Sequence, residues 1–503
     1  MRRVVFLFLP GIFLTVFFLQ CARKDAGDHK INDHPNIILF LVDDMGWQDS
    51  SEPFWKDTVA NNRWFRTPNI VRLADEGMKF TNAYASSPVC SPTRTAILSG
   101  MNPAHSRITN WIPGEGNGPA EKQKFLVPDW RIDGLDHTFV SLPQLLNEAG
   151  YTTIHIGKAH FGRQGTEGAD PHNLGFDISI AGNYRGQPGS YYVPYGDAKR
   201  DSQMTDLKKY FNDSLYLSDA LTDEALRMID TAVASGKPFF LNMAHYAVHT
   251  PIQGDRPQME KYRNPGKNEF QVAYATMIES IDRSLGDILQ KLQDLGIEKN
   301  TVLIFMSDNG GLVAHSGPPT TNYPLSSGKG SCREGGYREP MIVKWPGKVV
   351  PGSSCDLPVI AEDFFPTIVA MAGVKIPDTL VSKLDGTDLT PLLLQRGEIT
   401  RPHPLVWHYP HYWANKHIRD ADSTITPFSA IREGNWKLIY LYEKEQCELY
   451  NLAEDIGEQN NLTGDKPQLA KTMCTDLRNI LQQMNAQTPV DRESGVQVPL
   501  PHY

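Results

Sequence analysis

The 503-residue sequence is poor in cysteine and has no excess of positive charge. Its six cysteines are scattered without a C-x-x-C pair, which excludes a disulfide-rich scaffold and a cysteine-type zinc cluster. Two pairings stay open in an oxidising compartment, Cys447 with Cys474 or Cys332 with Cys355. The formal net charge of −9 argues against a nucleic-acid partner held by a general basic surface. With 40% hydrophobic residues and no internal repeat, the chain has the composition of a large globular protein.

Long apolar runs are also lacking, apart from one at the N-terminus. Arg2 and Arg3 precede an apolar stretch over residues 4–19, which is shorter than the about 20 residues that a membrane-spanning helix needs. This pattern predicts an export signal over residues 1–21. Cys21 ends it and resembles the lipidated cysteine of bacterial lipoproteins, although Gln20 departs from that signal. Lipidation, simple cleavage and a retained anchor stay open, and we expect an exported protein of the periplasm or cell surface, with a lipid anchor at Cys21 as one alternative.

Apolar strands alternate with amphipathic helices through most of the chain. Residues 36–42 form a continuous apolar stretch, as expected for a parallel strand covered on both faces. Further strands are predicted at 80–84, 152–156, 238–243 and 301–306, and helices at 67–77, 141–149 and 269–295. Thr67 and Pro68 are typical of a capped helix start. The order predicts an α/β fold with a large mixed, mostly parallel sheet between layers of helices.

The composition of the sequence changes near residue 396. An aromatic and histidine-rich stretch over 407–413 precedes two short predicted strands, 429–432 and 436–442, and a final amphipathic helix over 468–484. We therefore predict a catalytic domain over residues 31–395 and a smaller α+β subdomain over 396–503, built from a four-stranded or similar sheet and one helix.

Polar residues follow two of the apolar strands directly. Asp43 and Asp44 end the first strand, and Asp308 and Asn309 follow the strand over 301–306. Ligand sites of open parallel sheets lie at the carboxyl ends of the strands. Four oxygen donors at one such edge would suit a hard divalent cation, calcium first and magnesium second. Single residues of this kind more often only cap strand ends and helix starts.

The segment Cys90-Ser91-Pro92-Thr93-Arg94 carries the most specific pattern in the chain. It matches the C-x-P-x-R signature of type I sulfatases, and the order of motifs from about residue 35 to 462 is similar to that family of the alkaline-phosphatase superfamily. The other matching motifs are Asp43-Asp44, Gly157-Lys158-Ala159-His160, His249-Thr250-Pro251, Asp308-Asn309-Gly310 and Lys329 with Glu334-Gly335-Gly336. The resemblance implies an alkaline-phosphatase-like fold and a sulfuric ester hydrolase.

The resemblance also implies how the reaction is set up. A maturation enzyme would convert Cys90 to formylglycine, whose hydrated form is the nucleophile. The metal held by Asp43, Asp44, Asp308 and Asn309 would activate that nucleophile, with Cys90 itself part of the metal site.

The remaining implied roles belong to basic residues. Arg94 and Lys158 would hold the hydrated aldehyde, and Lys329 would clamp the sulfate. His249 is expected to be the general acid for the leaving oxygen, and His160 the base that regenerates the aldehyde. Taken singly, either lysine would more often be a solvated surface residue.

The aromatic stretch over 407–413 offers flat faces and imidazoles suited to a sugar ring. Similar bacterial sulfatases carry a comparable stretch near the substrate, so His408 and His411 are predicted substrate contacts. A packing cluster between domains is an equally good reading of this stretch.

The sequence thus predicts a sulfatase acting on O-sulfate groups of carbohydrates from sulfated polysaccharides. Two alternatives remain. One is a phosphonate or phosphodiester hydrolase of the same superfamily, and the other is a non-catalytic surface lipoprotein that binds glycans.

Overall fold

The computed structural model describes residues 34–114, 123–196, 204–313, 318–413 and 425–503. The predicted export signal and Cys21 lie outside these residues. Asn32–Tyr503 forms one compact unit, so the division near residue 396 remains a prediction. Among the described residues, no helix combines the length and the apolarity needed to cross a bilayer.

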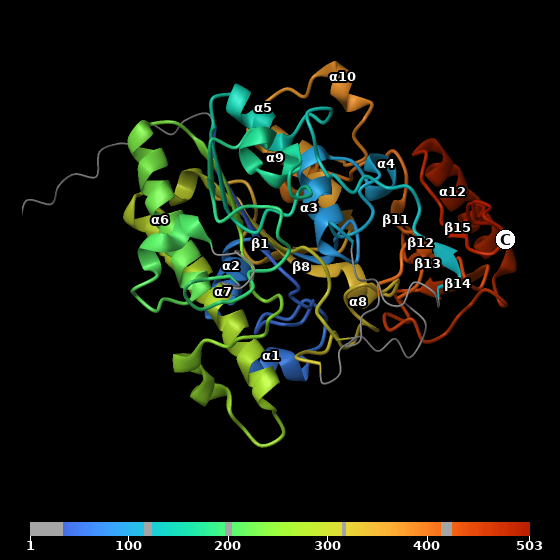
Figure 1. The fold of residues 1–503 in the computed structure, drawn as a ribbon, viewed down its shortest axis with the longest axis horizontal. Coiled ribbons are helices and arrows are strands. Elements are labelled where there is room, and N and C mark those ends of the chain that lie inside the picture. Colours follow the sequence, from blue (N-terminus) through green and yellow to red (C-terminus); the bar gives the residue numbers. More distant parts are fainter. Residues whose placement is uncertain (1–33, 115–122, 197–203, 314–317, 414–424) are drawn as a thin grey trace, which may run out of the picture. The chain divides into compact units, whose positions relative to one another are not determined.

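A nine-stranded sheet forms the centre of the described chain (Figure 1). Its order is β10-β2-β8-β7-β1-β6-β4-β5, with β9 also paired to β2, and only β8 runs antiparallel to its neighbours. The strands are β1 (Asn36–Val42), β2 (Met78–Tyr84), β4 (Thr152–Gly157), β5 (Ile178–Ile180), β6 (Phe239–Ala244), β7 (Thr301–Ser307), β8 (Arg338–Lys344), β9 (Ser353–Cys355) and β10 (Val359–Ile360). The predicted mixed, mostly parallel sheet is confirmed.

Helices cover both faces of this sheet, as β1 demonstrates. Ile38, Phe40 and Val42 point into a core with α2, α6 and α7, whereas the alternate residues of β1 point into a second core with α3, α5 and α9. These helices are α2 (Pro68–Glu76), α3 (Cys90–Ser99), α5 (Leu142–Glu148), α6 (Leu217–Ser235), α7 (Glu269–Asp294) and α9 (Phe364–Met371). Shorter helices are α1 (Ala60–Trp64), α4 (Pro103–Ser106), α8 (Glu334–Tyr337), α10 (Asp378–Val381) and α11 (Thr390–Leu393). Burial on both faces explains why β1 is apolar at every position.

One local expectation is wrong. Helix α2 begins at Pro68 as predicted, but the Thr67 hydroxyl does not cap it. Asp282, in α7, instead accepts hydrogen bonds from the backbone amides of Asn69 and Ile70. Thr67 accepts a hydrogen bond from the amide of Ser51. A tertiary contact replaces the local cap, which a sequence pattern does not reveal.

A separate antiparallel sheet of four strands lies in the C-terminal part, in the order β11-β12-β13-β14. Its strands are β11 (Leu405–Tyr409), β12 (Phe428–Glu433), β13 (Trp436–Leu441) and β14 (Gln446–Asn451). One face packs on helix α12 (Pro467–Gln483). The other face packs against the main body, where Trp407 stacks on Tyr337 with ring centroids 4.6 Å apart. A two-residue pair, β3 (Phe125–Leu126) with β15 (Val490–Asp491), completes the strands.

Candidate active site

Strand register brings the predicted site residues to one edge of the main sheet. Val42 of β1 pairs with Ser307 of β7, so Asp43 and Asp308 leave neighbouring strands at the same level. On the other side, Gly157 of β4 pairs with Ala244 of β6, and Lys158 follows directly. Parallel in-register strands therefore deliver two carboxylates and an ammonium group to one place, as expected for the carboxyl edge of such a sheet.

Three buried carboxylates and three buried cations meet there. Lys158 Nζ donates to both oxygens of Asp43 at 2.9 and 2.7 Å, and Lys329 Nζ donates to Asp44 at 2.6 Å. Arg94 Nε donates to Asp308 at 2.7 Å. None of these six side chains is more than 5% exposed.

Burial and the neighbouring charges shift the pKa values of Asp43 and Asp44 in opposite directions. Burial raises the pKa of Asp43 well above its usual value, and Asp308 and Asp44 add to this against the opposing effect of Lys158. Burial also acts to raise the pKa of Asp44, but Lys329 and His249 outweigh it and the pKa is lowered. The Asp43 carboxyl group would therefore be stabilised in its charged form by positive charge beyond what Lys158 and Arg94 supply.

The oxygen donors at this edge fit a hard divalent cation. Asn309 Nδ2 donates to Asp44 Oδ1 at 2.7 Å, whereas Asn309 Oδ1 is buried without any hydrogen-bond partner. A buried amide oxygen without a donor is costly, and a cation would satisfy it. Together with Asp43, Asp44 and Asp308 it offers the all-oxygen set that the sequence predicts.

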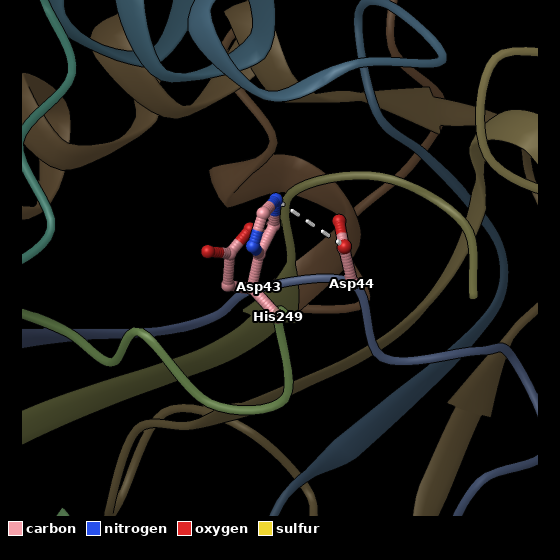
Figure 2. A group of neighbouring side chains, drawn as sticks. All are labelled: Asp43, Asp44 and His249. Carbon is pink, nitrogen blue, oxygen red and sulfur yellow. Dashed lines mark ion pairs between the residues drawn. The ribbon is translucent and has the colours of Figure 1, made fainter. Parts of the chain in front are cut away.

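A histidine also reaches this group, which the predicted ligand set does not include. Figure 2 shows His249 beside Asp43 and Asp44, and ligand atoms of all three lie within 4.8 Å of one another. His249 Nε2 lies 3.7 Å from Asp44 Oδ2. Its Nδ1 donates to the carbonyl of Thr250 at 2.9 Å, so Nε2 is the nitrogen that faces the carboxylates. Burial, with Lys329 next, lowers the pKa of His249 to about 3.

Cys90 begins helix α3 beside a second histidine. Its Sγ lies 3.5 Å from His160 Nδ1. His160 Nε2 donates to the carbonyl of Ile112 at 2.5 Å, which places the ring proton on Nε2 and leaves the Nδ1 lone pair toward Cys90. Burial, with Lys158 next, lowers the pKa of His160 well below its usual value. The neutral imidazole is therefore set to accept a proton from a group on residue 90.

One nitrogen of the Arg94 guanidinium has no hydrogen-bond partner. Its Nη1 donates to the carbonyl of Lys158 at 2.8 Å, and Nε is held by Asp308. Nη2 is buried without a hydrogen-bond partner and lies 3.8 Å from Asp43 Oδ1. The arrangement leaves a fixed guanidinium donor next to the metal ligands.

The two histidines of the aromatic stretch have different surroundings, and a substrate contact of His411 stays a prediction. Both ring nitrogens of His408 are engaged, with Ser429 and the carbonyl of Gln487, each at 2.7 Å, so this geometry leaves no ring nitrogen for a sugar. His411 Nε2 contacts Thr109 Oγ1 at 2.8 Å, but its Nδ1 has no hydrogen-bond partner. His408 therefore acts as a packing residue of the C-terminal sheet.

Trp413, an aromatic residue of this stretch, adjoins the site and was not among the predicted substrate contacts. Lys329 Nζ lies 5.8 Å from the centre of its ring. A Cβ at Gly330 would lie 1.9 Å from the indole, and Gly330 also has a positive φ of 84°. Glycine beside the lysine therefore lets the indole approach this loop. In the sequence, the only sign of this contact between Trp413 and the loop is the Lys329-Gly330 pair, and such pairs are too common to predict it.

The comparisons with known proteins agree with this picture. The family model described as "Sulfatase" matches residues 35–374, and the model "N-sulphoglucosamine sulphohydrolase, C-terminal" matches residues 329–487. A protein named "Sulfatase" from Formosa agariphila is 30% identical and covers 95% of this chain and 93% of its own length. N-acetylgalactosamine-6-sulfatase of Mus musculus is 34% identical over 73% of this chain and 68% of its own.

Among solved structures, Ps i-CgsB is similar with a TM-score of 0.70 and 28% identity, covering 93% of this chain and 95% of its own. A second structure of Ps i-CgsB contains k-i-k-neocarrahexaose.

Proposed function

The chain belongs to the sulfatase family and is a sulfuric ester hydrolase, and from this premise we propose that it removes O-sulfate groups from carbohydrates derived from sulfated polysaccharides. The observation that carries this proposal is the placement of Cys90 against His160 Nδ1, next to buried carboxylates and cations at the sheet edge. The similar Ps i-CgsB, whose structure contains a carrageenan-type hexaose, supports a carbohydrate substrate.

The residues at the strand ends would hold two groups that the reaction needs. Asp43, Asp44, Asp308 and Asn309 would bind calcium, or magnesium as second choice, which would supply positive charge to the sulfuryl oxygens. Cys90, converted to formylglycine by a maturation enzyme, would supply a hydroxyl nucleophile in its hydrated form. Arg94, through its unpartnered Nη2, and Lys158, through its ammonium group, would hold that hydroxyl pair.

The chain's own side chains would bind the anion and move protons. Lys329 Nζ would donate a hydrogen bond to the sulfate. Because the ammonium group of Lys329 is already buried, it would not have to lose bound water when the sulfate binds. His160 Nδ1 would accept the proton from residue 90, as its tautomer allows. His249 Nε2 would donate a proton to the leaving oxygen, and the negative charge of a bound sulfate would offset the lowering of its pKa by burial and by Lys329.

We also propose that the chain is exported, with residues 1–21 as the signal and Cys21 as a lipid-anchor candidate. The support is the basic start and the short apolar run of the sequence.

A panel of singly sulfated sugars, followed by ion chromatography of released sulfate, tests the substrate class. We expect sulfate release from at least one sugar O-sulfate. Turnover of nitrophenyl sulfate without release from any sugar would refute the carbohydrate proposal. Faster hydrolysis of a phenyl phosphonate than of the matched phenyl sulfate would favour the phosphonate hydrolase, and no hydrolysis of any ester would favour the glycan-binding alternative.

A further inference from the structure

A cavity of about 340 Å³ lies beside the C-terminal sheet, where β11 begins and β12 ends. Its wall contains prolines from the segments before β10 and before β11. Three basic side chains also line it, Arg401, His403 and Arg432, together with one acidic side chain, Glu433. None of these residues has a role in the site at the strand ends, so the cavity requires its own explanation.

Arg432 is a buried cation without a counter-ion. Only 4% of it is exposed, and its Nε donates to the carbonyl of Gly434 at 3.0 Å. Its Nη1 donates to the side chains of Asn82 and Tyr84, and the guanidinium lies over the Tyr84 ring. All these partners are uncharged, and Nη2 has no partner among the described residues. Burial lowers the pKa of Arg432 to about 10.

The other two basic groups of the cavity each have a carboxylate within ion-pair distance, although His403 Nε2 has no hydrogen-bond partner. Arg401 donates two hydrogen bonds to the Asp363 carboxylate, both at 2.7 Å. His403 Nε2 lies 3.9 Å from Asp385 Oδ1. Glu433 is exposed, and no carboxylate of the described residues forms an ion pair with Arg432. A buried charge without a counter-ion is unfavourable, so the guanidinium of Arg432 is the cation of this cavity that an anion would stabilise.

We propose that this cavity binds a sulfate ester group of the carbohydrate, distinct from the one that is hydrolysed. The inference rests on the proposed carbohydrate substrate. A planar guanidinium presents its donors to tetrahedral oxyanions in a fixed geometry, and the proline walls would pack against the apolar faces of a sugar ring. Free inorganic sulfate offers the same chemistry, and the experiment distinguishes the two sources.

The test measures affinity for k-i-k-neocarrahexaose and for inorganic sulfate by titration calorimetry, in a Cys90→Ala background that cannot turn over. Replacing Arg432 with Met should weaken hexaose binding by about 10- to 150-fold, the equivalent of about 1.5–3 kcal/mol for hydrogen bonds to a charged group. Replacing the rim residue with Glu433→Gln should tighten it by about 1.4- to 5-fold, because a like charge leaves the cavity. The exposed Glu454→Gln is the matched control and should change nothing.

Three outcomes separate the alternatives. Hexaose affinity that responds to both variants while sulfate affinity does not respond supports a carbohydrate-borne sulfate. A change in the affinity for inorganic sulfate alone would show a site for the free ion and would overturn the proposal. Unchanged hexaose affinity in Glu433→Gln would also overturn it, because this substitution of an exposed residue leaves the fold intact. Turnover of nitrophenyl sulfate by Glu433→Gln in the Cys90 enzyme should equal that of the wild type. Failure of the proposed function would instead appear as absence of sulfate release from every sugar.

Discussion

Two of the buried charge clusters in the described part of the chain are built differently. The catalytic cluster, at the strand ends of the main sheet, contains Asp43, Asp44, Asp308, Arg94, Lys158 and Lys329. The second, the Lys437 cluster, lies where the C-terminal sheet meets the loop after Lys329. There, Lys437 Nζ donates to Glu334 at 3.0 Å and to Glu458 at 2.7 Å. All three residues are buried.

The difference lies in what each cluster leaves unpaired. In the Lys437 cluster, the second oxygen of Glu458 accepts from the amide of Glu334, and the second oxygen of Glu334 accepts from the Tyr84 hydroxyl. In the catalytic cluster, Arg94 Nη2 and Asn309 Oδ1 are buried without partners. Buried charge by itself therefore does not identify a functional site; in the catalytic cluster it occurs together with buried polar atoms that have no partner.

The largest expected effect comes from the nucleophile position. Cys90→Ala should lower kcat by on the order of 10⁶, as expected when a nucleophile is removed, whereas Cys332→Ala, a second buried cysteine, should leave kcat close to wild type. Peptide mass spectrometry of active enzyme should show residue 90 with its thiol sulfur and two hydrogens replaced by one oxygen. Fully active protein that contains only unmodified cysteine would refute the formylglycine proposal.

The next effect separates two neighbouring histidines, the partly exposed His249 and the buried His245. His249→Ala should lower turnover of a sulfated sugar by about 10²–10⁴, because a sugar alkoxide needs a proton to leave. Nitrophenyl sulfate, with a good leaving group, should lose far less. His245, whose Nε2 contacts Ser284 at 2.9 Å, is the matched control, and His245→Ala should affect both substrates equally. Equal losses on the two substrates for His249→Ala would remove the general-acid role.

A mutation in the Lys437 cluster should affect stability rather than chemistry. Lys437→Met leaves Glu458 buried without its hydrogen-bonded cation and leaves Glu334 with Arg338 alone, at 3.3 Å. This should lower the free energy of unfolding by about 3–5 kcal/mol. Denaturant unfolding measures this, with the exposed Lys471→Met as control. The kcat per folded molecule should change much less than in His249→Ala. A stable variant with a large loss of kcat would place this cluster in catalysis and break the comparison.

Calcium should act on the catalytic cluster alone. At about 100 times its Kd, calcium should stabilise the chelator-treated protein by about 2.7 kcal/mol, because it binds only the folded state. Magnesium should do so less effectively. Asn309→Ala removes one oxygen ligand and should weaken the response, while Lys437→Met should retain it. Two zinc ions per chain in active enzyme, by elemental analysis, would contradict the all-oxygen ligand set.

Much of the fold was accessible from the sequence because it depends on local patterns. The apolar run over 36–42 coincides with β1, and the periodic residues over 269–295 form α7, which ends at Asp294. The cap of α2 could not be predicted, because it comes from Asp282, which is more than two hundred residues from Asn69 in the sequence, and not from Thr67. Local propensity fixes where elements lie, whereas the satisfaction of their end groups depends on which neighbours the fold supplies.

The same division applies to the site. The sequence by itself determined which residues gather at the sheet edge, because parallel strands must end together and the C-x-P-x-R segment is specific. Only the tertiary structure decided that both ring nitrogens of His408 are hydrogen-bonded, to Ser429 and Gln487. It also decided that His249 lies beside the carboxylates and that Arg432 has no counter-ion. Partners of a buried polar atom come from distant parts of the chain, so their presence or absence is set by packing and not by sequence spacing.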